Sequence, residues 1–396
     1  MSRLDELIQE LCPDGVDCRK LEDCCTVLDK KRKPVTKAAR EAGEYPYYGA
    51  NGIQDYVSDY IFDGTFVLVG EDGSVITKAG TPVVTWAEGK IWVNNHAHII
   101  EETDGVLLRY LFHYIQTIDV TPLIHGNIPK LTGGDFRALQ IPVPPLPVQS
   151  EIVRILDNFT ELTAELTAEL TARKKQYEFY RDCLLIFDDT VPLVKLSDLC
   201  EIGDGLHGTP TYCDDGEYYF INGNNLSNGK IVVDPKTKKI AKNEYEKIGI
   251  SFGETILFSI NGTIGNIAIY NNEKIALGKS AAYFNVISDR LLMKYLFYIL
   301  QSGPMMTYFE KNLTGSTIKN LGLKSLRDCQ IAVPSLNVQK RIVSILDRFD
   351  ALCNDLISGL PAEIEARTKQ YEYYRDKLLT FESAKKKGVS CSVQIH

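Results

Sequence analysis

The sequence predicts an α+β fold with an internal pseudo-two-fold repeat, in which two mixed domains alternate with two long amphipathic helices. Three observations support this prediction. Two nearly identical segments lie 190 residues apart, an apolar stripe at steps of three and four follows each of them, and short β-rich runs bounded by Gly, Asn and Asp fill the regions between. A chain of 396 residues is long enough for two or three domains.

Composition narrows the class of protein. The chain has no run of about 18 apolar residues, so we expect no transmembrane helix, and residues 1–7 lack the apolar core of a signal peptide. Ten irregularly spaced cysteines without a Cys-x-x-Cys pair favour reduced, mostly buried thiols in the cytosol over a zinc site or a disulfide framework. The net charge of −8 disfavours a simple electrostatic nucleic-acid binder, although it does not exclude local basic surfaces.

The regions between the repeated segments, each about 140 residues long, predict mixed α+β domains. Residues 66–69, 82–86 and 255–258 form short β-rich runs, and helical patterns follow near residues 107–116 and 291–301. The two regions correspond only faintly to each other. One such correspondence places Asp72-Gly73 and Asn261-Gly262 after equivalent predicted strands.

The repeated segments predict long helices. Residues 140–157 return as 330–347, and residues 172–182 return as 366–376, now 194 residues apart. The first helix would run over residues 149–187 and the second over 339–381, roughly 58 and 65 Å if continuous. Gly359-Leu360-Pro361 should kink the second helix or split it in two. The predicted apolar stripes comprise Ile152, Ile155, Leu156, Phe159, Leu162, Leu166 and Leu170, and Ile342, Ile345, Leu346, Phe349, Leu352, Leu356 and Leu360.

Each stripe needs a partner, because an isolated amphipathic helix of this length cannot bury its own apolar face. We expect the two helices to pair as an antiparallel coiled coil that separates the two domains, although each could instead pack on its own domain. The change of offset traces to residues 163–166 and 167–170, both Thr-Ala-Glu-Leu, where the second copy carries four residues more. Four residues add roughly 6 Å to a helix, so this tandem unit acts either as a ruler or as repeat slippage without consequence.

Polar and basic side chains in both domains favour DNA reading. Residues 19–40 carry a local charge of +5 and residues 230–247 one of +3. Basic residues contact phosphates, whereas Asn, His, Ser, Thr and Arg can read base edges; taken singly, such residues are more often turn formers, so the joint pattern carries the argument. The DNA-contact candidates are Lys30, Lys31, Arg32, Lys33, Lys37, Arg40, Asn51, Asn94, Asn95, His96, His98, His125 and Asn127, and His207, Asn222, Asn224, Asn225, Lys236, Lys238, Lys239, Asn261, Thr263, Lys279, Ser316, Thr317 and Lys319.

The sequence predicts no catalytic site. Residues 203–208 fit G-x-G-x-x-G, but Thr-Pro-Thr follows where a dinucleotide-binding helix should begin, and no P-loop string is present. Asp72 with Glu88 and Lys90 resembles a nuclease's acidic cluster, but the second domain lacks a counterpart. His96 and His98 share one strand face without an identifiable third ligand, so we expect no metal site.

Taken together, these motifs resemble the specificity subunit of type I restriction–modification enzymes. The resemblance rests on the Val-Gln-x-x-Ile-Val-x-Ile-Leu-Asp entry to each long helix, the Lys-Gln-Tyr-Glu-Phe/Tyr-Tyr-Arg-Asp near its end, and residues 7–16. It implies two target recognition domains, each reading one half of a bipartite DNA target, with the helices setting the spacer between the half-sites. It also implies a non-catalytic, cytoplasmic subunit in defence against foreign DNA.

The same resemblance implies partners and boundaries. It implies double-stranded DNA, two methylation subunits that bind S-adenosylmethionine, and two restriction subunits that translocate DNA with ATP and Mg²⁺; we expect no cofactor in this chain and no membrane. The expected domains are residues 1–147 with a short N-terminal helix and 188–337, the helical spacers 148–187 and 338–382, and a flexible tail 383–396. Two alternatives stay open: a scaffold of two binding domains on a coiled-coil spacer that grips a protein or glycan, and a self-sufficient DNA-modifying enzyme.

Overall fold

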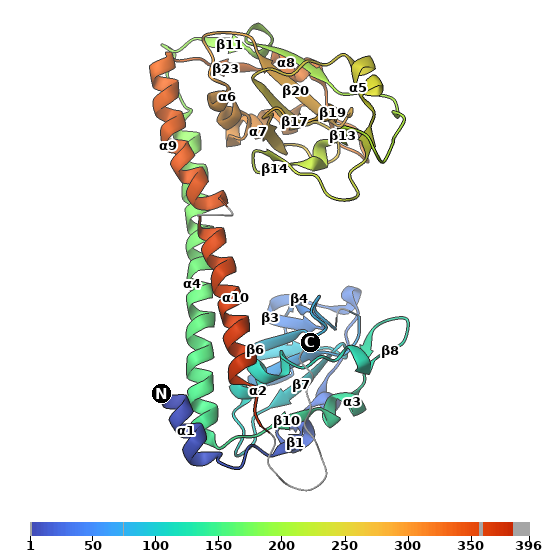
Figure 1. Ribbon diagram of the computed structural model, residues 1–396, viewed down its shortest axis with the longest axis vertical. Helices are drawn as coiled ribbons and strands as arrows, with labels where there is room; N and C mark the ends of the chain where they lie inside the picture. The colour runs from blue at the N-terminus through green and yellow to red at the C-terminus, as the bar shows by residue number, and fades with distance from the viewer. Residues whose placement is uncertain (1, 74, 356–358, 383–396) are drawn as a thin grey trace. The chain divides into compact units, whose positions relative to one another are not determined.

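A computed structural model describes residues 2–73, 75–355 and 359–382 of the chain (Figure 1). Its contacts divide the protein into two units. Unit 1 combines residues 1–165 with 365–396, and unit 2 consists of residues 166–364. Each unit contains one mixed domain together with segments of the long helices, so the predicted α+β organisation is confirmed. The predicted tail, residues 383–396, lies outside the described residues.

Unit 1 is built around a six-stranded sheet of order β2-β7-β5-β6-β3-β4. Its central strand, β5, is buried on both faces, because Phe66 and Leu68 enter one apolar cluster while Val67 and Val69 enter another. The described elements of its domain are α1 (Arg3–Leu11), β1 (Cys18–Lys20), β2 (Thr26–Val27), β3 (Ala42–Gly49), β4 (Gly52–Val57), β5 (Phe62–Gly70), β6 (Val84–Val93), β7 (Ala97–Glu101), α2 (Leu108–Ile115), β8 (Ile124–His125), β9 (Lys130–Leu131), α3 (Gly133–Ala138) and β10 (Gln140–Pro142).

Unit 2 contains a four-stranded antiparallel sheet, β12-β20-β17-β18, and a three-stranded sheet, β16-β13-β19. Strand β17 repeats the pattern of β5: Ile256 and Phe258 enter one cluster and Leu257 the other. The described elements of its domain are β11 (Leu193–Lys195), β12 (Cys200–Asp204), β13 (Tyr218–Ile221), β14 (Leu226–Ser227), β15 (Lys230–Ile231), β16 (Lys239–Ile240), α5 (Lys242–Ile248), β17 (Thr255–Ser259), β18 (Ile267–Ile269), β19 (Ile275–Leu277), β20 (Ala281–Val286), α6 (Met293–Leu300), α7 (Gly303–Lys311), β21 (Leu313–Thr314), β22 (Asn320–Leu321), α8 (Leu323–Asp328) and β23 (Gln330–Ala332).

The first long helix is continuous, whereas the second is divided. Helix α4 runs over Leu146–Leu184, including both Thr-Ala-Glu-Leu units. The second repeat forms α9 (Leu336–Asn354) and α10 (Leu360–Leu378), so the predicted interruption near Pro361 is confirmed. Asp355, which follows α9, is extended. Gly359 packs so closely over the end of α9 that a β-carbon there would lie 2.6 Å from the carbonyl oxygen of Ala351.

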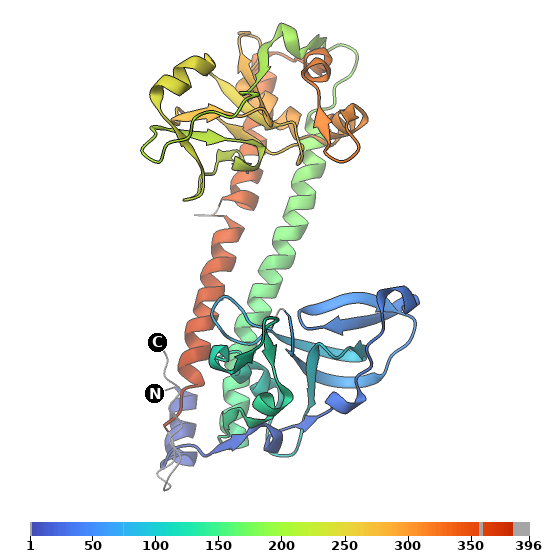
Figure 2. The same ribbon diagram turned by 90° about the vertical axis from the view of Figure 1, so that its right-hand side faces the viewer.

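Each unit contains its own antiparallel helix pair (Figures 1 and 2). In unit 1 the first half of α4 lies beside α10, and Phe159 stacks on Tyr374 with ring centroids 5.3 Å apart. In unit 2 the second half of α4 lies beside α9, where Tyr177 and Tyr180 both stack on Phe349. Among the described residues no helix is both long and apolar enough to cross a membrane.

The predicted apolar stripe is buried only near the domains. Ile152, Leu156, Ile342 and Leu346 are buried, and they also belong to the domain clusters. The prediction is wrong for two leucines, since Leu162 is 36% exposed and Leu352 is 40% exposed. Leu356 lies outside the described residues. Both proposed packing modes therefore operate: the helices pair with each other and also pack on their own domains.

Unit 1 joins residues that are far apart in the sequence. The backbone N–H of Val16 donates to the carbonyl of Glu382 at 2.9 Å, just after α10 and before β1. Leu379 belongs to the same apolar cluster as Leu4 and Val16, so the last helix completes this core. Unit 2 makes the corresponding connection with continuous chain, from the end of α4 into β11.

A buried glutamine ties each domain to the start of its helix. The side chain of Gln149 accepts a hydrogen bond from the N–H of Leu107 (2.9 Å) and donates to the carbonyls of Pro144 (2.7 Å) and Gly105 (3.1 Å). Gln339 repeats the arrangement in unit 2, accepting from Leu292 N–H (2.9 Å) and donating to the carbonyls of Arg290 and Pro334 (both 2.8 Å). Both glutamines are fully buried. The Val-Gln motif therefore marks a junction between domain and helix.

A second junction differs between the units in its titratable group. In unit 1 the buried ring of His113 bonds the carboxylate of Asp157 (2.8 Å) and the hydroxyl of Tyr371 (3.0 Å). Burial lowers the pKa of His113 below its ordinary value, although Asp157 opposes this shift. Unit 2 has Tyr298 in this place, and its hydroxyl donates to Asp347.

Candidate nucleic-acid interface

Three polar loops meet at one edge of unit 1. The N–H of Glu71 donates to the carbonyl of His96 (2.8 Å), which joins the loop after β5 to the turn before β7. The N–H of Gly73 donates to Pro129 (2.9 Å), and the N–H of Leu131 donates to Glu71 (2.8 Å). These bonds add the β8–β9 hairpin, which carries His125 and Asn127 at its tip, to the same surface. We call this surface, residues 71–73, 94–98 and 124–131, loop face 1.

The same three bonds recur in unit 2. The N–H of Ile260 donates to Ser280 (2.9 Å), that of Gly262 to Lys319 (2.9 Å) and that of Leu321 to Ile260 (2.8 Å). We call the resulting surface, residues 206–208, 260–263, 278–280 and 314–321, loop face 2. The 206–208 turn joins it because the N–H of Lys279 donates to the carbonyl of Leu206 at 3.1 Å.

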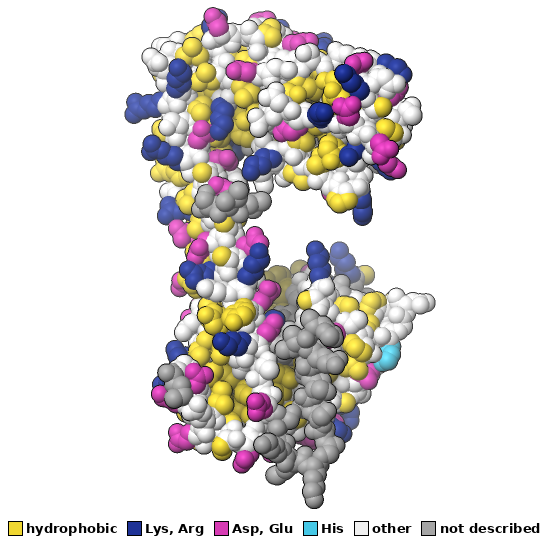
Figure 3. Space-filling view, in the orientation of Figure 1, with side chains coloured by type: hydrophobic (Ala, Val, Ile, Leu, Met, Phe, Trp, Pro, Cys, Tyr) yellow, Lys and Arg dark blue, Asp and Glu magenta, His cyan; other side chains and the backbone are white. Residues whose placement is uncertain are grey.

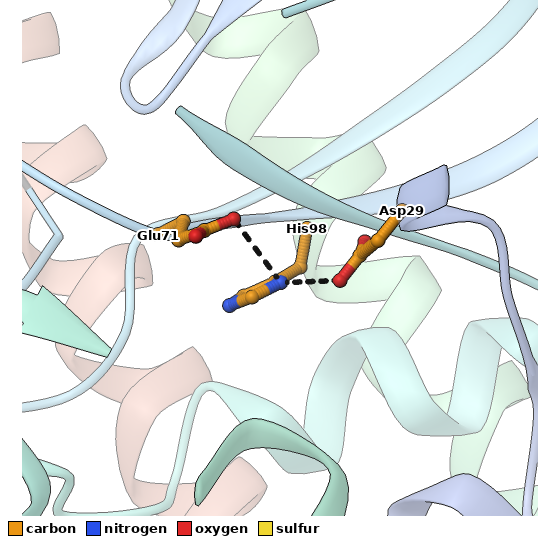
Figure 4. A group of neighbouring side chains, drawn as sticks. All are labelled: Asp29, Glu71 and His98. Carbon is orange, nitrogen blue, oxygen red and sulfur yellow. Dashed lines mark hydrogen bonds and ion pairs between the residues drawn. The ribbon is translucent and has the colours of Figure 1, made fainter. Parts of the chain in front are cut away.

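An ion network lies beneath loop face 1 (Figure 4). Nδ1 of His98 lies 2.8 Å from an Asp29 carboxylate oxygen and 3.6 Å from one of Glu71, while Nε2 lies 3.0 Å from the carbonyl of Leu131. Burial by itself raises the pKa of Asp29, but the hydrogen bond from His98 and the charge of Arg32 hold that pKa below its ordinary value. The network fixes the loops to the interior.

The carboxylates and the imidazole lie close enough to share a metal ion, but the surrounding charges do not suit one. Arg32 lies 2.6 Å from Glu71, and Lys130 lies 3.1 Å from the other oxygen of that carboxylate. Arg137 lies 3.6 Å from Asp29. Three cations already neutralise the two carboxylates, so a divalent ion would meet positive charge from every one of them. The network is therefore a structural ion cluster.

The structure corrects the prediction for three residues of unit 1. Arg32 is held by Glu71 and by the carbonyl of Ala97 (2.6 Å), and His98 is 1% exposed. Asn94 is 2% exposed; its amide donates to Gln54 at 3.3 Å. These three side chains position loops and are not available as direct DNA contacts. The sequence pattern did not separate them from exposed neighbours, because residue type does not report burial: Asn95 and His96 are exposed, whereas the adjacent Asn94 and His98 are buried.

The remaining candidates of unit 1 are exposed, except Arg40. His125, Asn127, Asn95 and His96 are exposed on loop face 1, and His96 bonds the carboxylate of Asp72. Lys30, Lys31 and Lys33 are exposed near this face, since the N–H of Lys33 donates to Val93. Asn51 is exposed in the β3–β4 turn. Lys37 is exposed, whereas Arg40 is half-buried: its guanidinium lies 4.1 Å from the centre of the Tyr47 ring and pairs with Asp55.

Loop face 2 brings together most of the candidates of unit 2. His207 and Lys279 are exposed, as are Thr263, Ser316, Thr317 and Lys319; Asn261 bonds Asn320 at 3.4 Å. Asn222 and Asn225 are half-buried and hold a turn, with Ser280 donating to Asn222 at 3.0 Å; Asn224 is exposed beside them. Lys236, Lys238 and Lys239 lie at or just before β16, which pairs with β13 on the side opposite β19.

Sequence reasoning missed the residues that hold these faces. Asp29, Glu71 and Arg137 were not singled out, although each anchors a loop of unit 1. Lys130 was also missed, although it lies at the base of the β8–β9 hairpin. The paired Asp72-Gly73 and Asn261-Gly262 strings were the available signal, because they mark the equivalent loops. Basic and acidic side chains are interspersed over the visible face of each unit (Figure 3).

Known proteins share both the sequence and the architecture. The family profile described as the type I restriction modification DNA specificity domain matches residues 13–173 and 189–366. A Haemophilus influenzae protein assigned as a type I restriction enzyme specificity subunit is 36% identical over 379 residues, covering 92% of this chain and 96% of that protein. The EcoR124I/EcoR124II specificity subunit of Escherichia coli is 35% identical over 71% of this chain and 72% of its own length.

A solved structure is similar in fold. The crystal structure of the type I restriction–modification S subunit from M. genitalium has a TM-score of 0.54 and 15% identity, covering 91% of this chain and 95% of that chain. The two profile matches each span most of one domain and its following helix. The chain therefore belongs to the family of type I restriction enzyme specificity subunits.

Proposed function

We propose that loop faces 1 and 2 each bind one half of a bipartite duplex DNA target. The observation that carries this proposal is that one backbone frame presents different side chains in the two units. The frame places His96 where unit 2 has Ser280, and Asp72 where unit 2 has Asn261. A constant frame with different polar groups suits two readers of different sequence, because base edges are distinguished by donor and acceptor pattern.

The chain acts in this proposal as a non-catalytic subunit in the prokaryotic cytoplasm. Two methylation subunits bind S-adenosylmethionine, and two restriction subunits translocate DNA with ATP and Mg²⁺. DNA binding by the isolated chain is weak, because its net charge of −8 opposes the approach of phosphates until a methylation subunit completes the surface. Full-affinity binding by the chain alone would contradict this part of the proposal.

The Thr-Ala-Glu-Leu units set the spacer in this proposal. Both units lie within the continuous helix α4, so deletion of residues 167–170 removes about one helical turn without introducing a break. We expect the deletion to shorten the spacer between half-sites and to leave both half-sites unchanged. A spacer that stays the same would refute the ruler.

The test is methylome sequencing of a host that expresses this chain with its methylation subunit. We expect a bipartite methylated sequence. Asn127→Ala on loop face 1 should relax or change one half, and Thr317→Ala on loop face 2 should change the other half. Lys175→Ala, at an exposed residue of α4 that belongs to neither loop face nor to the DNA-contact candidates, serves as the surface control. Variants on both faces that altered the same half would refute the assignment of one face to each half-site.

A mobility-shift assay separates DNA reading from the protein- or glycan-binding alternative. The probe is a duplex containing the methylome-derived sequence, with the chain and its methylation subunit assembled. Specific DNA binding should weaken steeply as salt rises from about 50 to 200 mM, because phosphate contacts release counterions. The same preparation without the S-adenosylmethionine-binding partner should neither methylate nor cleave DNA; activity of the purified chain alone would support the self-sufficient enzyme instead.

A further inference from the structure

The repeated helix starts differ in burial at only two positions. Corresponding residues of 146–160 in α4 and 336–350 in α9 agree in being buried, half-buried or exposed, except at two places one turn apart. Val148 is fully buried, whereas its counterpart Val338 is 41% exposed. Glu151 is 6% exposed, whereas its counterpart Arg341 is exposed. Something therefore covers this helix face in unit 1 and leaves it open in unit 2.

The covering element in unit 1 is the N-terminal helix α1. Figure 1 shows α1 beside the start of α4, and Asp5 of α1 lies close enough to Lys377, near the end of α10, for that lysine to help lower its pKa. Leu4 is buried in the same apolar cluster as Val148 and Leu379. A hydrogen bond from Arg154 holds the pKa of the Glu151 carboxyl below its ordinary value. Arg3 of α1 lies close enough for its charge to lower that pKa further. This face of unit 1 is therefore covered by an amphipathic helix whose apolar side is buried and whose Arg3 is opposite in charge to Glu151.

Unit 2 presents the same seat without an occupant among the described residues (Figures 1 and 2). Leu185, the counterpart of the buried Leu379, is only partly buried. It lines a hollow of about 530 Å³ between the end of α4, helices α6 and α7, and strands β11 and β23. Val338 and Arg341 project from the first two turns of α9 on one side. Unit 2 therefore has an exposed valine beside a positive charge, where unit 1 has a buried valine beside a negative charge.

We propose that this open seat on unit 2 binds an amphipathic helix of another protein chain. By analogy with α1, that helix presents apolar residues at i, i+4 and i+8, as Leu4, Ile8 and Cys12 do. It carries a carboxylate where α1 carries Arg3, because the residue facing that position is Arg341 and not Glu151. The inference goes beyond DNA reading and depends on neither DNA nor methylation.

Charge argues against the two nearest alternatives. The α1 helix of a second copy would set Arg3 against Arg341 with like charge. The C-terminal residues 383–396 carry three consecutive lysines, and their apolar residues Val389, Cys391, Val393 and Ile395 recur at every second position, which is the pattern of a strand and not of an amphipathic helix. A heterologous helix with an acidic flank is therefore the occupant that fits.

The test uses the full chain and a defined peptide probe. The probe, called the acidic peptide, has the sequence of residues 2–13 with Arg3→Glu and Cys12→Ala, a fluorescent label, and a hydrocarbon staple between positions 6 and 10, which are exposed in α1. The staple holds the peptide helical and reduces the entropy lost on binding. A second peptide, called the basic peptide, differs only in keeping Arg3. Fluorescence anisotropy gives the affinity of each peptide for the chain.

The expected result is saturable binding of the acidic peptide, about threefold or more tighter than that of the basic peptide. Val338→Asp should weaken binding about tenfold or more by placing a carboxylate in the apolar contact, and Arg341→Glu should reverse the preference between the peptides. Val232→Asp, at another exposed apolar residue of unit 2, serves as the control and should change nothing. Melting curves confirm that the variants are folded.

Three outcomes would overturn the proposal. The first is no saturation at peptide concentrations on the order of 1 mM, where even a weak site fills. The second is equal affinity for both peptides together with indifference to Val338→Asp. The third is a dimer of the chain alone, seen by light scattering and abolished by Val338→Asp, which would make a second copy the occupant. None of these outcomes bears on whether loop faces 1 and 2 read DNA.

Discussion

Replacement of the buried glutamine at the start of α9 should weaken unit 2 by about 3 kcal/mol. Gln339 and leucine have similar volume, so Gln339→Leu removes polar contacts without opening a cavity of note. The variant loses three hydrogen bonds, one from the Leu292 N–H and two to the carbonyls of Arg290 and Pro334. Each such bond contributes on the order of 1 kcal/mol net. The Leu292 N–H then lacks its partner, which adds to the loss, whereas the carbonyl of the exposed Arg290 can turn to water.

Differential scanning calorimetry measures this effect. For a unit of this size, 1 kcal/mol shifts the melting temperature by roughly 2–4 °C, so we expect a fall of about 6–12 °C. Lys340→Leu, at the exposed next residue of the same helix, is the control and should stay within about 2 °C of the parent. The reasoning is refuted if the melting temperature of Gln339→Leu equals that of the control variant. Gln149→Leu should produce a loss of the same size in unit 1.

Other contacts lead to three more predictions. The pKa of His113 is lowered in the folded state, so the contribution of this residue to stability is intact above its unfolded pKa of about 6.5 and is lost as pH falls below that value. His113→Tyr, which introduces the tyrosine found at this place in unit 2, should therefore flatten the decline in melting temperature between about pH 7 and 5.5. Parallel declines in the variant and the parent would contradict the argument. Gly359→Ala places a β-carbon 2.6 Å from the carbonyl oxygen of Ala351, so we expect a loss of about 1–3 kcal/mol in denaturant titrations, and an unchanged midpoint would count against that close contact. Arg32→Met leaves Glu71 with only Lys130 as its cation and should cost about 2–3 kcal/mol, with greater hydrogen exchange in residues 94–98 as its local signature; unaltered exchange there would mean that the ion network does not hold the loop.

The sequence predicted the repeated scaffold well because its signal is periodic and duplicated. The apolar steps that include Ile152 and Leu156 recur in the second copy, and both copies are helical and buried at these positions. The break near Pro361 was also predictable, since proline and glycine act locally on the backbone. Exposure in the middle of α4, at Leu162, was not predictable, because periodicity gives the side of a helix that is apolar and says nothing about how far along the helix a partner extends.

The candidate interface was predicted less completely. Residue type identified polar loops but not their burial, so Arg32 and His98 were grouped with exposed neighbours although they lie in an ion network. That network depends on Asp29 and Glu71, which lie far apart in sequence and come together only through the sheet register. The equivalence of the two loop faces was visible in sequence only as one faint pair of Asx-Gly turns. Backbone hydrogen bonds preserve the frame while the side chains on it diverge.

The bond between Val16 and Glu382 has a consequence for how the protein is made on the ribosome. The residues of unit 2 are contiguous, so this unit can fold as soon as residue 364 has emerged, whereas unit 1 waits for α10 and Leu379 to complete a core that includes Leu4 and Val16. At translation speeds of 5–20 residues per second, the 199 intervening residues impose a delay of roughly 10–40 s. During that interval the nascent first domain exposes the apolar surface that Leu379 will later cover, which makes it a client for chaperones and a target for proteases until residue 379 has been added.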